Sequence, residues 1–236
     1  MIGLPKLKSC GQSDLGDDGT RTWDEQIGDY IDRNYPGWQN PVHTSMVPPE
    51  FSYRTRNPDE GQRTEKDFFE LVQKFGESRK EGMFVFHSPR FKERDSEWNE
   101  YLTKTESNWL IGEHDFVIIH RQLGIVFFQV KAASKTRGKF GLANQQLDKD
   151  QQSLHAFAVE YLQGKLKRDV DKEVYLYPGF VVMPNCPRPT SPQFQYKNGI
   201  FKEDCETVEA FSKWWEKNIK RKMTIDQEVF DCLVMR

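Results

Sequence analysis

The sequence predicts an α/β fold in which a mixed central sheet is flanked by helices. Two neighbouring segments, residues 112–120 and 124–131, are rich in Val, Ile and Phe and have the length of strands. Strands that are apolar on both faces are usually covered by helices on both sides. Segments with helical periodicity stand before and after further strand segments, which gives the order helix, three strands, helix, strand.

We expect residues 1–60 to form an N-terminal extension that packs on the core, and residues 61–236 to form the main domain. The extension is rich in Gly, Asp, Pro and Asn, and only residues 23–33 have the pattern of a short helix. Its aromatic residues Trp23, Tyr30, Tyr35 and Trp38 favour packing against the body of the protein. They would equally suit an arm that covers a functional site and regulates it.

The first helix of the main domain is expected at residues 64–75, with Thr64 as its N-cap and Gly76 as its end. Its apolar residues share one helical face. Glu65 lies at the edge of that face, whereas Glu70 points outward. Of the two glutamates, Glu65 is therefore the one that faces inward.

The next strand is expected at residues 83–87, and the two segments that follow it form a predicted β-hairpin that gathers three polar side chains at one end. If the turn is centred on Gln122, Asp115 faces Gln129, and Lys131 lies two residues further along on the same face. A slip of one residue would send Asp115 to the opposite face from Gln129, so this register requires an odd-length turn or a bulge.

Three more elements complete the predicted fold. A basic, glycine-containing loop follows the hairpin, and the elements beyond it are a long helix at residues 142–163, a fourth strand at residues 173–183 and an amphipathic helix at residues 207–222.

Composition excludes several classes of protein. Lys and Arg total 34 against 36 Asp and Glu, so a net charge of −2 gives no global attraction to nucleic acid, and a polyanion would have to be bound by a local patch. The four cysteines form no CxxC pair, which argues against a zinc site or a disulfide framework. No signal peptide or membrane-spanning segment is evident, so we expect an intracellular protein, cytoplasmic or nuclear. The P-loop, GxSxG, HExxH and dinucleotide motifs are absent.

This element order, with an inward acid on the first helix, Asp115 at the start of one strand and Val130-Lys131 at the end of the next, resembles the restriction-endonuclease-like PD-(D/E)xK nuclease superfamily. The segments Glu113-His-Asp-Phe-Val-Ile-Ile and Gly124-Ile-Val-Phe-Phe-Gln-Val-Lys are most similar to the nuclease-related domain called NERD. The resemblance covers residues 62–185. It implies a restriction-endonuclease-like core of αβββαβ order and a metal-dependent nuclease that cuts DNA, or RNA, with little sequence specificity.

The resemblance also implies roles for individual residues. Asp115 matches the metal-binding aspartate, Lys131 the catalytic lysine and Glu65 the acid of the first helix, while Gln129 stands where Glu or Asp is usual. Mg²⁺ or Mn²⁺ would be held by Asp115, the Gln129 amide oxygen, the Val130 carbonyl oxygen and Glu65. Lys131 would hold the attacking water or stabilise the charge on the phosphorus oxygens.

Nucleic acid, chiefly DNA, is the expected partner. Lys135, Arg137 and Lys139 in the loop after the hairpin would contact the phosphate backbone without reading sequence. A helix glutamine of related domains matches Gln145, Gln146 or Gln151, and Gln151 lies on the expected inner face. Cutting both strands of a duplex would need two sites, as in a homodimer.

Simpler explanations exist for the same residues. Lys131 could merely form a buried ion pair with Asp115. Glu65 could be favoured by the helix dipole, because an acid in a first helical turn is stabilising anywhere. The main functional alternative is a catalytically inactive module of the same fold that binds nucleic acid or a protein partner.

Overall fold

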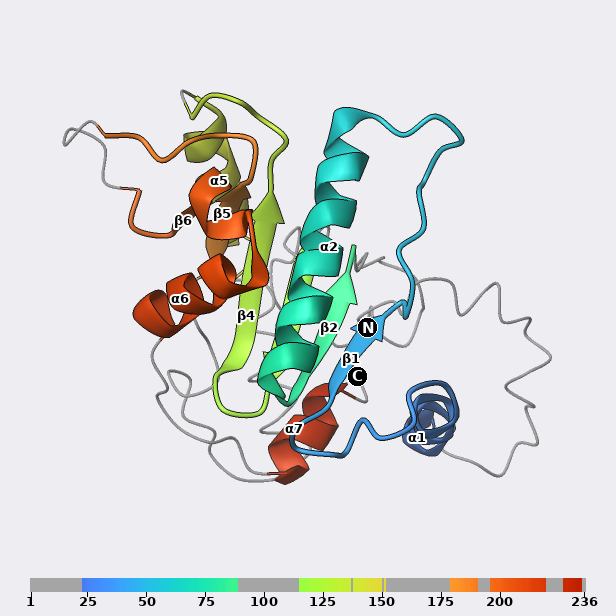
Figure 1. Ribbon diagram of the computed structural model, residues 1–236. Helices are drawn as coiled ribbons and strands as arrows, with labels where there is room; N and C mark the ends of the chain where they lie inside the picture. Colours follow the sequence, from blue (N-terminus) through green and yellow to red (C-terminus); the bar gives the residue numbers. More distant parts are fainter. Residues whose placement is uncertain are drawn as a thin grey trace, which may run out of the picture.

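The computed structural model (Figure 1) describes residues 23–88, 115–136, 138–149, 151, 179–190, 196–219 and 227–234. The predicted α/β class is confirmed, because a six-stranded mixed sheet lies between helices. In chain order the elements are α1 (Trp23–Asn34), β1 (Thr44–Val47), α2 (Glu60–Arg79), β2 (Met83–His87), β3 (Phe116–His120), β4 (Gly124–Val130), a helix at residues 139–149, β5 (Phe180–Met183), β6 (Gly199–Phe201), α5 (Lys202–Cys205), α6 (Val208–Asn218) and α7 (Gln227–Val234).

The strand order within the sheet follows the chain, β1-β2-β3-β4-β5-β6. Strand β3 is antiparallel to both of its neighbours, whereas the other pairs are parallel. The carboxyl ends of five strands therefore meet the amino end of β3 at one edge of the sheet. Asp115 directly precedes β3, so this edge brings Asp115 next to the residues that end β2 and β4.

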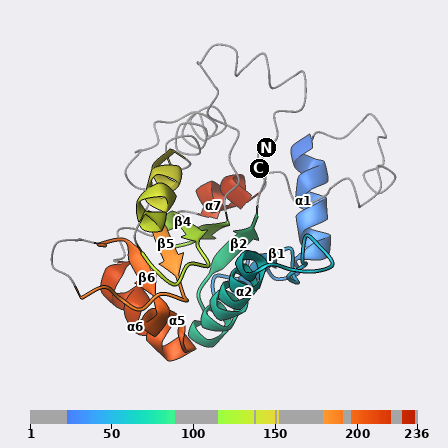
Figure 2. The same cartoon turned by 90° about the horizontal axis from the view of Figure 1, so that it is seen from above.

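Helices cover both faces of the sheet, as predicted from the doubly apolar strands (Figure 2). Side chains alternate between the two layers: Val117 and Ile119 pack with the helix at 139–149 and with α7, whereas Phe116 and Ile118 pack with α2 and α6. Every residue of β3 and β4 is buried. Polar side chains in these strands are consequently held in a low-dielectric interior.

The predicted register of the hairpin is confirmed. Val117 lies opposite Phe127, and Ile119 lies opposite Ile125. The turn at residues 121–123 has the odd length that this register requires. Gly124 closes the turn with a φ of 79°, in the left-handed region where a residue without a Cβ is favoured.

The boundaries of α2 differ from the prediction. The N-cap is Asp59, which accepts a hydrogen bond from the backbone N–H of Gln62 at 2.8 Å, and not Thr64. Thr64 lies inside the helix, where its hydroxyl donates to the Glu60 carbonyl oxygen at 2.8 Å. Both residues are good caps, and the sequence pattern did not show that the helix extends one turn beyond its apolar face.

The expected end of α2 at Gly76 is also wrong, because α2 continues to Arg79 and Lys80 adopts the left-handed cap conformation with a φ of 54°. Gly76 instead permits close packing between α2 and β1. A Cβ atom added to Gly76 would lie 2.2 Å from the Thr44 hydroxyl oxygen, which is closer than atoms can approach. This glycine therefore serves the packing of the helix and does not end it.

Strand β1 was not predicted, because its four residues, Thr44–Val47, lie within a stretch rich in turn residues. It is an outermost strand of the sheet and pairs with β2. Tyr35 and Trp38 join the same core layer as β1 and pack on Phe84, with ring centroids 5.3 Å and 6.4 Å away. The expected division between residues 1–60 and 61–236 stays a prediction.

The other elements agree with the prediction in part. Strand β2 has the predicted bounds. The helix expected at 142–163 begins at residue 139, and residues 152–163 and 173–178 lie outside the described residues. Thr207 caps α6, in agreement with the predicted start of that helix, but α6 ends at Asn218 and not at residue 222. The elements β6, α5 and α7 were not predicted.

Within the described ranges, no helix combines the length and the apolar character needed to cross a membrane.

Cys186 and Cys205 are free thiols. Burial raises the pKa of both thiols, which disfavours the reactive thiolate form.

Candidate functional site

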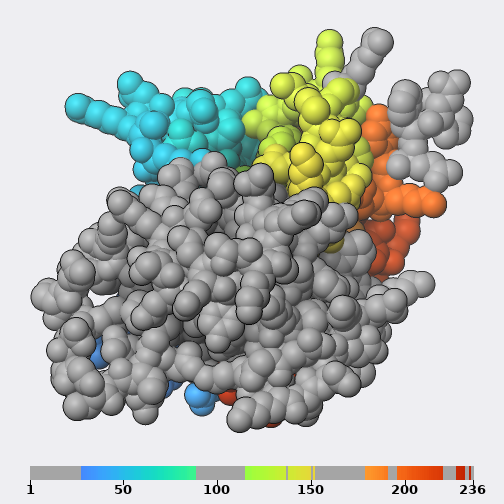
Figure 3. Space-filling model, turned by 180° about the vertical axis from the view of Figure 1, so that it is seen from behind, coloured from blue at the N-terminus to red at the C-terminus, as the bar shows by residue number. Residues whose placement is uncertain are grey.

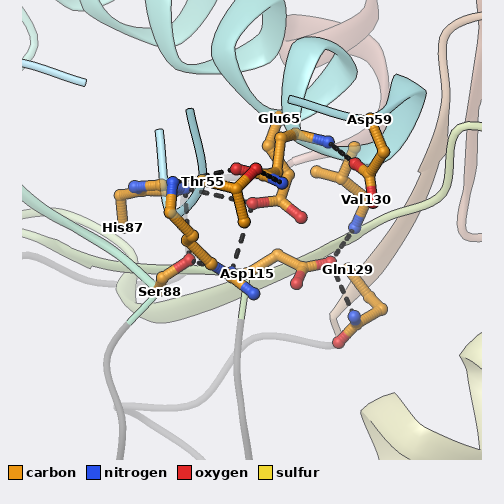
Figure 4. Close-up of polar contacts among 10 residues, drawn as sticks. Thr55, Asp59, Glu65, His87, Ser88, Asp115, Gln129 and Val130 are labelled. Carbon is orange, nitrogen blue, oxygen red and sulfur yellow. Dashed lines mark hydrogen bonds and ion pairs between the residues drawn. The ribbon is translucent and has the colours of Figure 1, made fainter. Parts of the chain in front are cut away.

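The candidate site lies at the sheet edge where β2 and β4 end and β3 begins. Figure 4 shows Asp115 between Glu65, which comes from α2, and Gln129, which comes from β4. His87 and Ser88 follow from the end of β2. The sheet topology thus brings together residues that are 65 positions apart in the chain, from Glu65 to Val130.

Asp115 is held by two hydrogen bonds to the same carboxylate oxygen. Its Oδ2 accepts from the Gln129 side-chain Nε2 at 2.6 Å and from the backbone N–H of Val130 at 2.7 Å. Asp115 thereby satisfies a backbone donor at the end of the β3–β4 ladder. The other oxygen, Oδ1, accepts no hydrogen bond from the residues that the structure describes.

Burial raises the pKa of Asp115 to about 7. Loss of hydration is the main cause, attraction from Lys131 opposes it, and repulsion from Glu65 adds to it. The residue is only 7% exposed. A second carboxylate and a lysine therefore both lie within electrostatic reach of Asp115, which is the grouping that the sequence predicted.

Glu65 reaches this edge from the layer of α2, on the opposite side of the sheet from Val117 and Phe127. Its side chain is 14% exposed, whereas that of Glu70 is 42% exposed and pairs with Lys66 and Lys74. The predicted inward and outward orientations are confirmed. Because α2 begins at Glu60, Glu65 lies in its second turn, where the helix dipole no longer explains an acid.

Arg54, His87 and Ser88 complete the surroundings of Glu65. Glu65 Oε2 lies 3.3 Å from the Arg54 guanidinium and 3.4 Å from Nε2 of His87. The Ser88 hydroxyl lies 2.7 Å from the guanidinium and 3.2 Å from His87 Nε2. Ser88 has a φ of 47°, and a non-glycine residue in this left-handed region carries backbone strain.

The sequence did not identify these three residues. Only His87 left a signal, since it ends a strand that is otherwise apolar and does so at the edge where β4 also ends. Arg54 belongs to the loop between β1 and α2, where no periodic pattern places a side chain. The backbone N–H of Ser88 donates to the Asp115 carbonyl oxygen at 2.8 Å, a contact between residues distant in the chain that no local pattern indicates.

Lys131 directly follows β4 and is half-buried. Its backbone N–H donates to the Val182 carbonyl oxygen at 2.8 Å, so the adjacent strand β5 fixes its position. Within the described part of the chain, Lys131 and Asp115 form no ion pair and are linked only by electrostatic attraction. The simpler explanation, a buried Lys131–Asp115 pair, is therefore absent from this arrangement.

The residues expected to contact nucleic acid lie further out. Lys135 and Lys139 are exposed, Gln151 is half-buried, and Arg137 lies outside the described residues. The loop at residues 131–136, which carries Lys135, lies beside the N-terminal end of α2 (Figures 1 and 3), and Lys139 is the first residue of the helix at 139–149. The structure thus places them at the same edge as Asp115 but not in contact with it.

The donor set fits a divalent cation in part. Asp115 and Glu65 offer carboxylate oxygens, and a cation between them would relieve their mutual repulsion. Gln129, however, turns its amide nitrogen toward Asp115, so its oxygen would coordinate only after the amide turned over. Among the described residues, no three His, Cys, Asp or Glu side chains gather as a metal site. Water or phosphate oxygens would have to supply most of the ligands.

Comparison with known proteins gives no relative. No family model, no curated protein and no solved structure matches the chain.

Proposed function

We propose that this protein is a metal-dependent nuclease that hydrolyses phosphodiester bonds of DNA, or RNA, with little sequence specificity. The observation that carries the proposal is the convergence of Asp115, Glu65 and Lys131 at one sheet edge, with Asp115 fixed by the 2.6 Å hydrogen bond from Gln129. A buried carboxyl group such as Asp115, whose pKa is raised by burial and influenced by neighbouring charges, is typical of functional sites. The resemblance of the same residues to the PD-(D/E)xK pattern supports this choice of reaction.

Asp115 and Glu65 would hold Mg²⁺ or Mn²⁺. The bound ion would supply Lewis acidity and a lowered pKa for water. In the reaction, a water oxygen forms a bond to phosphorus, the ester P–O bond breaks, and protons pass from the water to solvent and to the leaving oxygen. Lys131 would stabilise the negative charge that builds up on the phosphorus oxygens.

The orientation of Gln129 favours a second candidate function, a binding module without catalysis. An amide that donates to Asp115 satisfies the carboxylate where a ligand oxygen would be expected to face a cation. In that case the edge would still bind a nucleic-acid backbone through its lysines, but it would hold no metal.

A hydrolysis assay separates the two candidates. Purified protein is incubated with labelled single-stranded and double-stranded DNA and RNA in Mg²⁺ or Mn²⁺, beside Asp115→Asn, Lys131→Ala and Glu65→Gln. We expect cleavage by the wild type and a loss of at least ~100-fold in the Asp115 and Lys131 variants, the range found when a stabilising group is removed from a transition state.

Glu70→Gln is the matched control for Glu65→Gln, because it removes the same charge from the exposed face of the same helix. Cleavage should be unchanged in this variant. Folded wild-type protein that cleaves none of the substrates with either metal, and that binds no Mn²⁺ in a calorimetric titration, would overturn the nuclease and leave the binding module.

A further inference from the structure

The loop between β1 and α2 places a cation, Arg54, beside the candidate site. The loop is held at two points, one before Arg54 and one at Arg54 itself. Before it, Phe51 packs against Phe69 and His87, with ring centroids 5.7 Å and 4.7 Å away. At Arg54 itself the backbone N–H donates to the Gln62 side-chain oxygen at 2.8 Å. The arginine is therefore carried by an anchored stretch of backbone.

The guanidinium is positioned by polar groups on two different elements. It donates to the Ser88 hydroxyl at 2.7 Å and lies 3.3 Å from Oε2 of Glu65. It also lies within electrostatic reach of Asp115. Ser88 holds its hydroxyl there at the cost of a strained backbone, with a φ of 47°, and strain of this kind clusters at ligand-binding sites.

Arg54 remains accessible in spite of these contacts. Its side chain is 36% exposed, whereas the Glu65 side chain that it meets is 14% exposed. The guanidinium thus contacts Glu65 and Ser88 while the side chain still reaches the surface. A guanidinium in this position suits a phosphate group, because its planar array of donors matches two phosphate oxygens.

The two cations of the site lie beside the ends of different strands. Lys131 follows β4, and Arg54 is held against Ser88 at the end of β2, with Asp115 at the start of the intervening strand β3. A phosphodiester that crosses this edge at Asp115 would be flanked by a cation on each side. The two positive charges offset the negative charges of Asp115 and Glu65, which by themselves would repel a phosphate.

We infer that Arg54 binds the nucleic-acid backbone at the candidate site, as the phosphate-contacting partner of Lys131 on the opposite side of Asp115. This inference rests on the proposed function, since it takes nucleic acid as the ligand. It adds a binding residue outside the region of resemblance and assigns the β1–α2 loop to the substrate-binding surface.

The test measures binding separately from cleavage. Affinity for a fluorescein-labelled single-stranded DNA oligonucleotide is determined by anisotropy over a series of KCl concentrations, with Ca²⁺ in place of Mg²⁺ and with the oligonucleotide checked for integrity. Arg54→Ala should weaken binding about tenfold, as expected for one charge-assisted contact. It should also reduce the slope of log K against log salt by ~0.7, the value for one lost phosphate contact on a single strand.

Arg56→Ala is the matched control, because Arg56 is an exposed arginine of the same loop with no contact to the site among the described residues. Affinity and slope should be unchanged in this variant. Arg54→Lys keeps the charge and should keep the slope. Thermal unfolding of each variant shows whether the fold is intact.

A double variant excludes an indirect effect through Glu65. If Arg54 acts only by neutralising Glu65, the effect of Arg54→Ala should disappear in a Glu65→Gln background. If Arg54 contacts phosphate, the tenfold loss and the smaller slope should persist in that background. Disappearance of the effect would overturn the inference.

The remaining outcomes separate this inference from the proposed nuclease. Weaker binding by Arg54→Ala, with no hydrolysis by the wild type, would support the phosphate contact and contradict the enzyme. Hydrolysis by the wild type, with an unchanged slope in Arg54→Ala, would overturn the phosphate contact alone. Wild-type protein that does not bind the oligonucleotide would overturn the inference.

Discussion

The buried carboxyl of Asp115 should make the protein less stable as pH rises, and Asp115→Asn should remove that dependence. The pKa of this group is about 7 in the folded protein against 3.8 for the free side chain. The folded state therefore binds the proton more tightly than the unfolded chain. Asp115 costs no stability below about pH 4, an increasing amount between about pH 4 and 7, and its full cost above pH 7.

The full cost follows from the two pKa values. At about 1.36 kcal/mol for each tenfold difference in proton affinity, it is ~4 kcal/mol. Asparagine is neutral at every pH, and the pKa of Asp115 already includes the backbone hydrogen bond from Val130, so Asp115→Asn should gain this full ~4 kcal/mol at pH 8. For a chain of this size, the midpoint of thermal unfolding at pH 8 should rise by roughly 8–16 °C.

Thermal unfolding of both proteins, followed by circular dichroism from pH 4.5 to 8.5 in EDTA, tests this reasoning. The two stability curves should meet at low pH and separate as pH rises. Glu70→Gln, which removes an exposed carboxylate, should run parallel to the wild type. An Asp115→Asn protein that is less stable than the wild type at pH 8 would refute the conclusion that this charge is buried at a cost.

Three further predictions concern other parts of the molecule. Gln129→Glu places a second carboxylate against Asp115, so it should lower the midpoint of thermal unfolding in EDTA. The same variant should bind Mn²⁺ at least ~10-fold more tightly in calorimetry. An unchanged affinity would place the metal elsewhere. Arg121→Ala should lower the free energy of unfolding in urea by ~3 kcal/mol, because the buried guanidinium lies 3.9 Å from the Phe230 ring and donates to the Trp38 carbonyl oxygen. A loss below ~1 kcal/mol would contradict this reasoning. Gly76→Ala should also destabilise by ~2 kcal/mol in the same assay, because its Cβ would collide with Thr44, and a neutral effect would show that α2 and β1 can separate freely.

Local patterns in the sequence were sufficient to predict the hairpin of β3 and β4 at the centre of the sheet. The apolar runs at β3 and β4, the odd turn between them and the alternation of side chains determined the register that sets Asp115 against Gln129. Helical periodicity likewise determined that Glu65 faces inward and Glu70 outward. These features depend on residues close together in the chain, where strand and helix periods fix which side each residue takes.

Other features were decided only by the tertiary structure. Strand β1 forms in a turn-rich stretch because β2 offers an edge to pair with, and Gly76 lies inside a helix because β1 crosses closely there. Arg54 reaches Glu65 only because its loop is anchored on α2, and the pKa of Asp115 depends on its burial and on the charges of Lys131 and Glu65. Contacts between distant segments leave no periodic pattern in the sequence. The sequence therefore determined which residues the sheet presents at the candidate site. Tertiary packing determined the neighbours and the charge states of those residues.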